Sequence, residues 1–382
     1  MNNSLSEPSS TPHASAHHPA ELISEYFLRL NANQEPVDLL DDVVQAIFDG
    51  DNGLQHREFH LASLLYSNPN PSVEFIVKLV RAALKVDGFP DKERVSLAPK
   101  KDRKVVSVAG SGKKGIKTIN ISTSAAIVAA SLGAQVIKHA SRATSSQTGS
   151  SDFFSDVGGR ILDADGTIQV FNVTDFGLFS IEGMVPKFNA LYGGRVLSPT
   201  ALSYALPAAI SPVRTDAILY GFSIPRIKES VLAIHEFGFK DVVVANSTDD
   251  GTKYIDEAGL FKTNFVAHSR IVGEDAGVIL ADPIHTLGME KRHSINEILQ
   301  KNTKKENVVA GVNILRGKGN EVQNEIVALN AGLMLLLSGA CDDLRQNFHD
   351  ALSEIQSARP YEKLVEIIEA TGGEFNSDLI SE

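Results

Sequence analysis

Two kinds of hydrophobic spacing divide the chain. From about residue 20, apolar residues recur three and four positions apart in four successive segments, at 20–32, 37–50, 56–68 and 72–89. This spacing places apolar side chains on one face of a helix, and Gly, Asn or Pro separates the segments. We therefore expect a small helical domain over residues 20–98.

Beyond residue 98 the pattern changes to short β-rich runs that alternate with helical segments. The runs are 104–110, 134–140, 216–222, 241–247 and 306–315, and the clearest helical segments are 122–133 and 226–239. Strands separated by helices predict a parallel sheet with helices on both faces. The expected fold is α/β, with the small N-terminal helical domain followed by a large α/β domain over residues 99–382 with a mainly parallel central sheet.

Composition adds limits to this picture. Residues 1–19 are rich in Ser, Pro, His and Asn and carry too little apolar surface to fold, so we expect a flexible tail. The remainder has the composition of a soluble globular protein, with 43% hydrophobic and 22% charged residues. No run approaches the roughly 20 apolar residues of a membrane helix, and no secretion signal is visible. We expect a cytoplasmic protein that makes no membrane contact, with its single cysteine, Cys341, as a buried thiol.

Charge is unevenly distributed. The formal net charge of −11 argues against a general nucleic-acid binder, which needs clustered Lys and Arg to neutralise phosphates. Yet "PKKDRK" at 99–104 and "GKKGIK" at 112–117 together place seven basic residues around one acid, Asp102. This basic island is either a solvated surface or a region that steers an anionic ligand.

The strongest chemical signal is a glycine-rich loop that follows the first β-rich run. Gly110, Ser111 and Gly112 precede a helix whose start carries Asn120 and hydroxyl residues, among them Ser122 and Thr123. Glycines allow close backbone approach, and a helix N-terminus offers N–H groups and partial positive charge to a phosphate. A tight turn with N-capping hydroxyls is the alternative interpretation. The spacing of a Walker A motif is absent.

A second strand end carries similar groups. The end of the run at 134–140 and the segment after it supply cationic groups, a histidine and several hydroxyls, namely Lys138, His139, Arg142, Ser145, Ser146 and Ser150. In parallel sheets, ligands bind at the carboxyl ends of strands, where loops lead into helices. Two successive strand ends of this kind predict a ligand with more than one phosphate.

These motifs occur in an order that resembles a known family. "NISTSAAIVAA", "KHASRATSSQTGSSD", a late "IDE" and "NEIVALNAGLMLLLSG" are similar to the motifs of the anthranilate phosphoribosyltransferases of tryptophan biosynthesis and their paralogues, glycosyltransferase family 3. The similarity extends from about residue 20 over nearly the whole chain. It implies a homodimer and a site for phosphoribosyl pyrophosphate bridged by Mg²⁺.

The resemblance also implies roles for particular residues. The donor would be bound by Gly110, Ser111, Gly112, Asn120, Ser122, Thr123, Lys138, Ser145, Ser146 and Ser150. Mg²⁺ would be bound by Ser122, Asp256 and Glu257, and the acceptor by His139, Ser141 and Arg195. The implied reaction is displacement of pyrophosphate at the anomeric carbon by an amine, without a covalent enzyme intermediate.

The chain departs from the family pattern at several positions. Lys113 and Lys114 replace a glycine and an acid of the usual first loop, and Ala140 and Ser141 stand where a glycine and an amide are usual. The acceptor-side segment is shorter than usual, with Arg195 as a substitute for the family's carboxylate-binding arginine.

Three functions therefore stay open at the level of sequence. The first is a phosphoribosyltransferase for anthranilate or a related small aromatic or nitrogenous acceptor. The second is a repurposed paralogue that binds nucleic acid or another polyanion through the basic loop region. The third is a pyrimidine or thymidine phosphorylase, over which the K-H-x-x-R and L-N-A-G runs favour the anthranilate branch.

Overall fold

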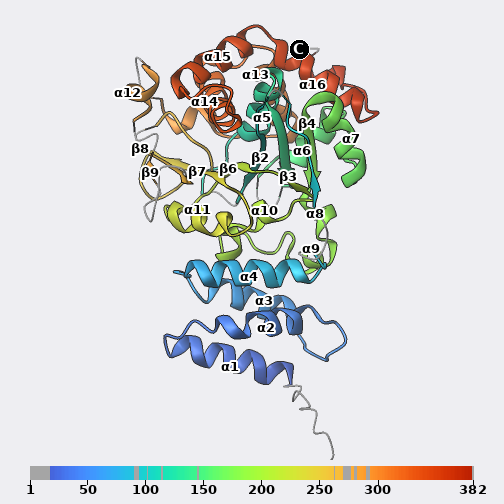
Figure 1. The fold of residues 1–382 in the computed structure, drawn as a ribbon, viewed down its shortest axis with the longest axis vertical. Coiled ribbons are helices and arrows are strands. Elements are labelled where there is room, and N and C mark those ends of the chain that lie inside the picture. The colour runs from blue at the N-terminus through green and yellow to red at the C-terminus, as the bar shows by residue number, and fades with distance from the viewer. Residues whose placement is uncertain are drawn as a thin grey trace, which may run out of the picture.

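The computed structural model describes residues 18–89, 94–100, 102–112, 115–143, 146–261, 263–269, 277–278, 282–289 and 293–380 (Figure 1). The α-helices are α1 (Pro19–Asn31), α2 (Leu40–Phe48), α3 (Arg57–Tyr66), α4 (Val73–Lys85), α5 (Ile121–Ser131), α6 (Ser150–Asp156), α7 (Ala164–Thr174), α8 (Ile181–Met184), α9 (Pro186–Tyr192), α10 (Leu206–Ala209), α11 (Ile227–His235), α12 (Pro283–Leu287), α13 (Lys304–Leu315), α14 (Glu321–Ser338), α15 (Leu344–Gln356) and α16 (Arg359–Ala370). Short 3-10 helices are η1 (Val37–Leu39), η2 (Ala201–Tyr204), η4 (Ile295–Ile298) and η5 (Ser377–Leu379). The strands are β1 (Val95–Ser96), β2 (Val105–Gly110), β3 (Gln135–Ala140), β4 (Phe176–Ser180), β5 (Val213–Arg214), β6 (Ala217–Gly221), β7 (Asp241–Thr248), β8 (Thr263–His268) and β9 (Gly277–Val278).

A seven-stranded sheet forms the centre of the molecule. Its order is β4-β3-β2-β6-β7-β8-β9. The first five strands in this order pair in parallel, whereas β8 pairs antiparallel with β7 and β9 pairs antiparallel with β8. The predicted α/β class with a mainly parallel sheet is confirmed. From β2 the chain moves to β3 and β4 on one side and returns to β6 on the other. The crevice between β2 and β6 is therefore the switch point at which sheets of this kind bind ligands.

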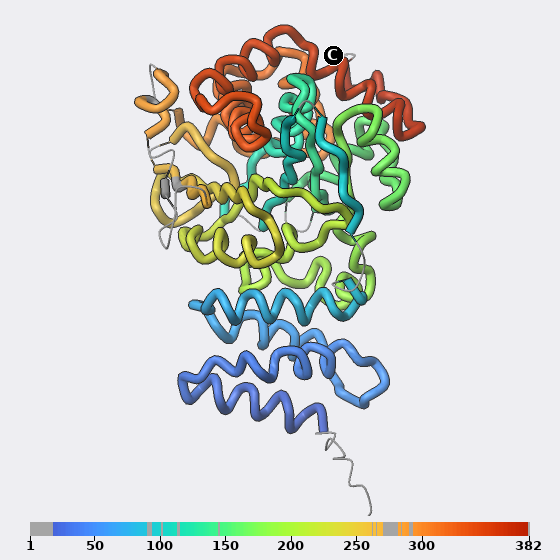
Figure 2. The backbone as a smooth tube through the Cα atoms, in the orientation of Figure 1, coloured from blue at the N-terminus to red at the C-terminus, as the bar shows by residue number. Residues whose placement is uncertain are grey.

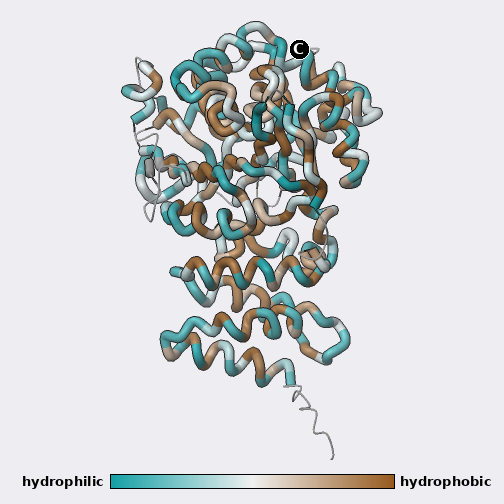
Figure 3. Tube along the Cα trace, in the orientation of Figure 1, coloured by the Kyte–Doolittle hydropathy of each residue, from teal (hydrophilic) through white to brown (hydrophobic). Residues whose placement is uncertain are grey.

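Alternate residues of the central strands enter two different hydrophobic cores. Leu219 of β6 and Val243 of β7 pack with α5 and α13–α16 on one face of the sheet. Their neighbours Ile218 and Val242 pack with α1–α4 and with residues 185–239 on the other face. Side chains alternate across a strand, so a strand buried on both faces reads as a continuous apolar run. Hydrophobic positions accordingly concentrate in the strands, and hydrophilic ones appear along the outer helices (Figure 3).

The N-terminal helices lie at one end of the molecule and α14–α16 at the other (Figures 1 and 2). Helix α4 contacts α11 and η2, which connects α1–α4 to the second core. This core contains residues on both sides of the boundary expected near residue 98. The division into a tail over 1–19, a helical domain over 20–98 and an α/β domain over 99–382 stays a prediction. Residues 1–17 lie outside the described part of the chain.

One expected strand is wrong. Residues 306–315 lie within helix α13, whose start is capped by Thr303, with the side chain of Glu306 bonded back to the Thr303 backbone. Val308, Gly311, Val312 and Leu315 are buried, a spacing that follows one face of a helix. The β-branched residues in the run suggested a strand, but the capping box and the buried helix face determine the structure.

Two further expectations concern exposure. Cys341 is half-buried rather than buried, because α14 ends at Ser338 and the thiol lies in the turn that follows, where its sulfur accepts a hydrogen bond from the Asp343 N–H. In the part of the chain that the structure describes, no helix combines the length and the apolar character needed to cross a membrane.

Candidate active site

A cavity at the carboxyl ends of β2 and β3 brings together most of the predicted site residues. Its volume is about 130 Å³. The predicted residues that line it are Gly110, Gly112, Asn120, Ser122, Lys138, His139, Ser141, Ser146, Ser150, Asp256 and Glu257. They come from four separate segments of the sequence, so it is the fold that assembles them. The cavity lies beside the switch point between β2 and β6.

Two glycines shape the switch point. Gly110 ends β2, Gly221 ends β6, and the two are paired in register. A Cβ at Gly221 would lie 1.8 Å from the backbone oxygen of Asp256, and one at Gly110 would lie 3.0 Å from Asp256 Oδ2. Only residues without side chains leave room for the 255–257 segment between the strand ends. The sequence did not predict the role of Gly221, because a glycine that is needed only for its lack of a side chain belongs to no recognisable motif.

Hydrogen bonds hold the first glycine-rich loop against this segment. The Gly112 N–H donates to Asp256 Oδ2 at 3.1 Å, and the Ser111 N–H donates to the Gly221 carbonyl at 2.8 Å. Gly112 has a φ of +59°, which glycine adopts without strain. Ser111 is buried beside Ser223 and does not line this cavity. Lys113 and Lys114 lie outside the described residues.

Helix α5 begins at the cavity. Asn120 is its N-cap residue, and Ser122 lies in its first turn. The unpaired N–H groups of a helix start attract anions. Thr123 is fully buried, and its Oγ1 has no hydrogen-bond partner among the described residues. Thr123 does not line the cavity, so the donor role expected for it stays a prediction.

The serine-rich loop folds back onto helix α6. Asp152 Oδ2 accepts hydrogen bonds from the N–H groups of Ala143 at 2.7 Å and Gly149 at 3.0 Å. Ser146 and Ser150 line the cavity, whereas Ser145 lies outside the described residues. Thr148 also lines it, and its buried Oγ1 lacks a partner in the described part of the chain. Sequence reasoning did not select Thr148.

His139 is buried as a neutral imidazole. Its burial, reinforced by the charge of Lys138, lowers its pKa to about 4. Nδ1 lies 3.0 Å from the Pro207 carbonyl, which only accepts, so Nδ1 donates and Nε2 accepts from the Ser107 hydroxyl at 3.2 Å. Thr215 Oγ1, at 2.8 Å from Ser107 Oγ, then donates to it. This chain of hydrogen bonds fixes the ring in one tautomer, so His139 is held in place rather than free to shuttle protons.

Asp256 and Glu257 form the acidic side of the cavity. Both are largely buried, at 9% and 6% exposure. Within the described residues, no cluster of three or more His, Cys, Asp or Glu side chains is arranged to hold a metal ion. Two carboxylates beside a helix start fit Mg²⁺, which binds proteins through one or two carboxylates and completes its shell with water and phosphate oxygens.

A second cavity adjoins the first and is mainly apolar. It has a volume of about 120 Å³ and shares Gly110, Gly112 and Ser141 with the first. Phe188 and Tyr192 of α9 line it, with ring centroids 4.9 Å apart. Burial raises the pKa of the Tyr192 phenol, which keeps this wall uncharged. Such a surface accommodates an aromatic ring. These residues were missed because they lie in the segment where the family motifs are least similar.

Arg195 lines neither of the two cavities. Its guanidinium is exposed and donates from Nη1 to the Ala190 carbonyl at 2.8 Å, at the end of helix α9. Cations stabilise the carboxyl ends of helices in this way. The acceptor role expected for Arg195 therefore stays a prediction, without a place in the cavities described above.

The basic island of the sequence is divided in the structure. Lys100, Arg103 and Lys104 precede β2, whereas Lys117 follows it and lines the cavity. A six-residue strand spans roughly 20 Å, so the described residues of the first run and Lys117 lie at opposite ends of β2. Lys100 pairs with Asp175 at 2.6 Å, Lys104 pairs with Asp241, and Arg103 bonds the carbonyls after α5. The described basic residues therefore do not form one continuous surface. Lys101 lies outside the described residues.

Comparison of the sequence with known proteins identifies the family of this chain. A model of the α/β domain of a glycosyl transferase family matches residues 102–359, about two thirds of the chain. The chain belongs to this glycosyl transferase family. Among its relatives, an anthranilate phosphoribosyltransferase of Sodalis glossinidius is 31% identical over 274 residues, covering 70% of this chain and 78% of that protein. The corresponding protein of Shewanella frigidimarina is 29% identical over 292 residues, covering 71% and 77%.

Solved structures of glycosyl transferase family members share the fold. The anthranilate phosphoribosyltransferase of Saccharomyces cerevisiae, in complex with PRPP and Mg, superposes with a TM-score of 0.75 at 18% identity, over 93% of this chain and 99% of that one. The Thermus thermophilus enzyme gives 0.73 at 22% identity, over 92% and 99%. The resemblance found in the sequence motifs is thus confirmed at the level of family and fold.

Proposed function

We propose that this chain is a phosphoribosyltransferase that transfers ribose 5-phosphate from phosphoribosyl pyrophosphate to anthranilate or a related small aromatic amine. The observation that carries the proposal is the pair of adjoining cavities at the switch point. One combines a helix start, hydroxyls, two lysines and two carboxylates, and the other is apolar and aromatic. A phosphorylated donor and an aromatic acceptor match these two surfaces and would meet where the cavities share Gly110, Gly112 and Ser141.

The residues of the first cavity would bind the donor. The start of α5, with Ser122, binds the phosphate oxygens, and the Lys138 ammonium adds a positive charge from inside the sheet. The Gly112 N–H orients Asp256. Asp256, Glu257 and Ser122 would hold Mg²⁺, which neutralises the charge that develops on the leaving pyrophosphate.

The second cavity would place the acceptor for attack. In the transfer, the bond between the anomeric carbon and the pyrophosphate oxygen breaks, the bond to the amine nitrogen forms, and the amine loses a proton. Holding the two reactants in line supplies much of the rate acceleration. Phe188 and Tyr192 orient the ring of the acceptor, while neutral His139 keeps the shape of the site without adding charge.

The acceptor is tested by measuring pyrophosphate release from phosphoribosyl pyrophosphate and Mg²⁺ with a panel of aromatic amines that includes anthranilate. We expect release that depends on the amine. Tyr192→Ala is expected to raise the KM for the amine by about tenfold or more, because it removes an aromatic contact. Arg195→Gln tests the acceptor role expected from the sequence, and we expect it to leave the KM unchanged because Arg195 lines neither cavity. No release with any amine would contradict the proposed function.

The proposal also includes the setting of the enzyme. We propose a cytoplasmic homodimer that acts in tryptophan biosynthesis, supported by the motif resemblance and by the relatives described above. Light scattering of the purified full chain measures the oligomeric state, and a monomeric mass would contradict the dimer. Polyanion binding as an alternative loses support, because the described basic residues before β2 already have carboxylate or carbonyl partners.

A further inference from the structure

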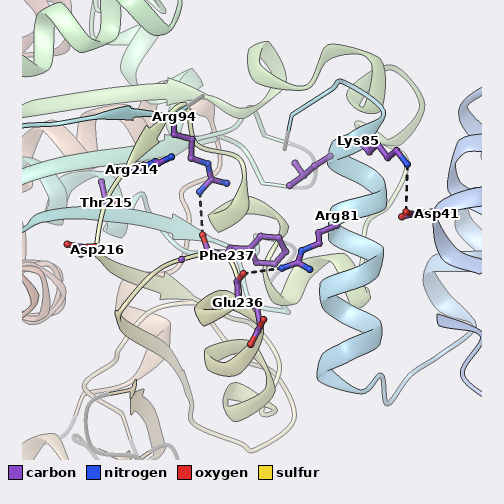
Figure 4. Close-up of a pocket in the computed structure, with 11 residues that line it drawn as sticks. Asp41, Arg81, Lys85, Arg94, Arg214, Thr215, Asp216, Glu236 and Phe237 are labelled. Atoms are coloured by element: carbon purple, nitrogen blue, oxygen red, sulfur yellow. Dashed lines mark hydrogen bonds and ion pairs between the residues drawn. The ribbon is translucent and has the colours of Figure 1, made fainter. Parts of the chain in front are cut away.

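A larger cavity lies at the amino end of β6, whereas the candidate active site lies at the carboxyl ends of the strands. It has a volume of about 680 Å³, within the range of small-molecule sites. Helix α4 forms one wall, and the opposite wall comes from β5, the start of β6 and the end of α11 (Figure 4). None of its lining residues belongs to either cavity of the candidate active site.

Four cationic side chains line this cavity, namely Arg81, Lys85, Arg94 and Arg214. The pairing of β1 with β5 places Arg94 and Arg214 together. Val95 pairs with Val213 and Ser96 with Arg214, so Arg94 and Arg214 lie two residues apart in register on the same side of this small sheet. Burial, and then the charge of Arg214, lower the pKa of the Arg94 guanidinium. Two like charges are thus held close together by the fold.

The acidic residues of the cavity do not neutralise the arginines. Lys85 pairs with Asp41 at 3.8 Å, and Asp216 pairs with Lys240 at 3.2 Å. The Glu236 carboxylate points away from Arg81 in Figure 4, and Arg81 instead contacts the Glu236 backbone oxygen. Among the described residues, no carboxylate forms an ion pair with any of the three arginines. Three guanidinium groups with no ion-paired carboxylate among the described residues give the cavity a positive charge that attracts an anion.

Phe237 fixes two of the arginines. Its carbonyl accepts a hydrogen bond from Arg94 Nη1 at 3.4 Å, while Arg94 Nη2 donates to the Ala209 carbonyl at 3.0 Å. Its ring lies 5.8 Å from the Arg81 guanidinium carbon, in a cation–π contact. Arginines that are already oriented lose less entropy when they bind a ligand. Arg214 is exposed, and nothing in the described part of the chain accepts a hydrogen bond from its guanidinium.

We propose that this cavity is a binding site for the phosphate group of a small phosphorylated molecule. Arg94 and Arg214 bind the phosphate oxygens, since a planar guanidinium forms paired, charge-assisted hydrogen bonds with a phosphate. A dianion matches the charge of the two guanidinium groups. Leu84 and the Phe237 ring form the apolar surface for the organic part of the ligand.

The test is calorimetric titration of the full chain with phenyl phosphate at constant ionic strength, with phthalate as a carboxylate probe. Arg214→Gln and Arg81→Gln remove charge inside the cavity. Lys304→Gln is the matched control, because it removes the charge of a surface lysine whose partner, Asp156, also lies outside the cavity. We expect Arg214→Gln to weaken phenyl phosphate binding about tenfold or more, Arg81→Gln to weaken it less, and Lys304→Gln to leave it unchanged.

Three outcomes would overturn the proposal. The first is equal binding of phenyl phosphate to all variants. The second is tighter binding of phthalate than of phenyl phosphate, which would make the site a carboxylate site. The third is the absence of phenyl phosphate binding to the wild-type chain at millimolar concentration. Lys138→Gln separates this proposal from the proposed function. Phenyl phosphate binding that is lost in Lys138→Gln but kept in Arg214→Gln belongs to the donor cavity and contradicts a second site.

Discussion

Gly221 shows how one residue controls the geometry of the site. The Asp256 backbone oxygen lies 1.8 Å from the place where a Gly221 Cβ would be, so the acidic segment approaches the end of β6 only because this residue has no side chain. Asp256 is also fixed by the Gly112 N–H at 3.1 Å. The position of the predicted metal-binding pair therefore depends on contacts with two glycines.

Replacing Gly221 with alanine is expected to displace the 255–257 segment. The added methyl overpacks the strand end at a cost of about 1–3 kcal/mol in the free energy of unfolding, and it moves Asp256 away from the cavity. Donor binding measured by calorimetry should weaken by more than tenfold. Gly183→Ala is the matched control, since a Cβ there meets nothing closer than 3.9 Å and both stability and donor binding should persist. Unchanged donor binding in Gly221→Ala would contradict this geometry.

His139 gives the fold a pH dependence of defined sign. Its pKa in the folded protein is lowered to about 4 from an unfolded value of 6.5, so the unfolded chain binds the proton more readily between these values. The stability that neutral His139 contributes is complete above pH 6.5 and is lost as the pH falls toward 4. A difference of this size corresponds to about 3 kcal/mol.

The measurement is urea unfolding of the wild-type chain and His139→Asn between pH 8 and pH 4. The asparagine amide occupies the place of Nδ1 and keeps a donor for the Pro207 carbonyl. We expect the difference in free energy of unfolding between the two proteins to shrink by about 3 kcal/mol on acidification. The reason is that unfolding of the wild type alone is favoured by proton uptake at residue 139. A gap that stays constant with pH would show that His139 is not held neutral.

At the residue scale, the sequence motifs located most of the residues that line the first cavity, but not the aromatic residues of the second. Asn120, Ser122, Lys138, Asp256 and Glu257 lie in short contiguous motifs, and each lines the cavity. The apolar cavity is built from isolated side chains of α9, η2 and α10, which no spacing connects. Whether these residues bind the ligands stays a prediction until they are tested.

At the scale of elements, local signals were most informative where they agreed with one another. Strands β2, β3, β6 and β7 were predicted because each is a buried apolar run flanked by loop residues. Residues 306–315 carried conflicting signals, β-branched residues in a helical burial pattern, and the capping box at Thr303 and Glu306 marked the helix. Helix α13 is thus a case in which end signals outweigh residue propensity.

The cap of α13 is expected to contribute measurably to stability. The Glu306 N–H donates to Thr303 Oγ1 at 3.2 Å, and the Thr303 N–H donates to Glu306 Oε2 at 2.9 Å. Thr303→Ala leaves these helix-start groups to water and should lower the free energy of unfolding by about 1 kcal/mol. Thr303→Ser keeps the oxygen and should lose a smaller part of it. Equal losses in both variants would mean that the hydroxyl does not cap the helix.

At the scale of the whole molecule, the sheet separates charges that the sequence places close together. The basic residues before β2 and the glycine-rich loop after it lie at opposite ends of that strand, and those described before β2 have local partners. The linear sequence cannot show this, since two basic runs on either side of a short strand look like one cluster. The arginines of the larger cavity show the converse: Arg81, Arg94 and Arg214 are distant in sequence and adjacent in space.

The whole molecule also explains how the two cavities of the candidate site are formed. One core holds the sheet and α5 in place, and the other connects the sheet to α9, η2 and α10, which carry the apolar cavity. The central claim is that a phosphorylated donor binds in the first cavity, through Asp256 and Glu257 with Mg²⁺.

The most direct test is calorimetric titration of the full chain with phosphoribosyl pyrophosphate, with and without Mg²⁺, in the wild type and in the Asp256→Asn, Glu257→Gln double variant. The account predicts wild-type binding that requires Mg²⁺ and is at least tenfold weaker in the double variant, because two carboxylates of the metal site are lost. The absence of donor binding to the wild type at millimolar concentration, or equal binding by the double variant, would contradict it.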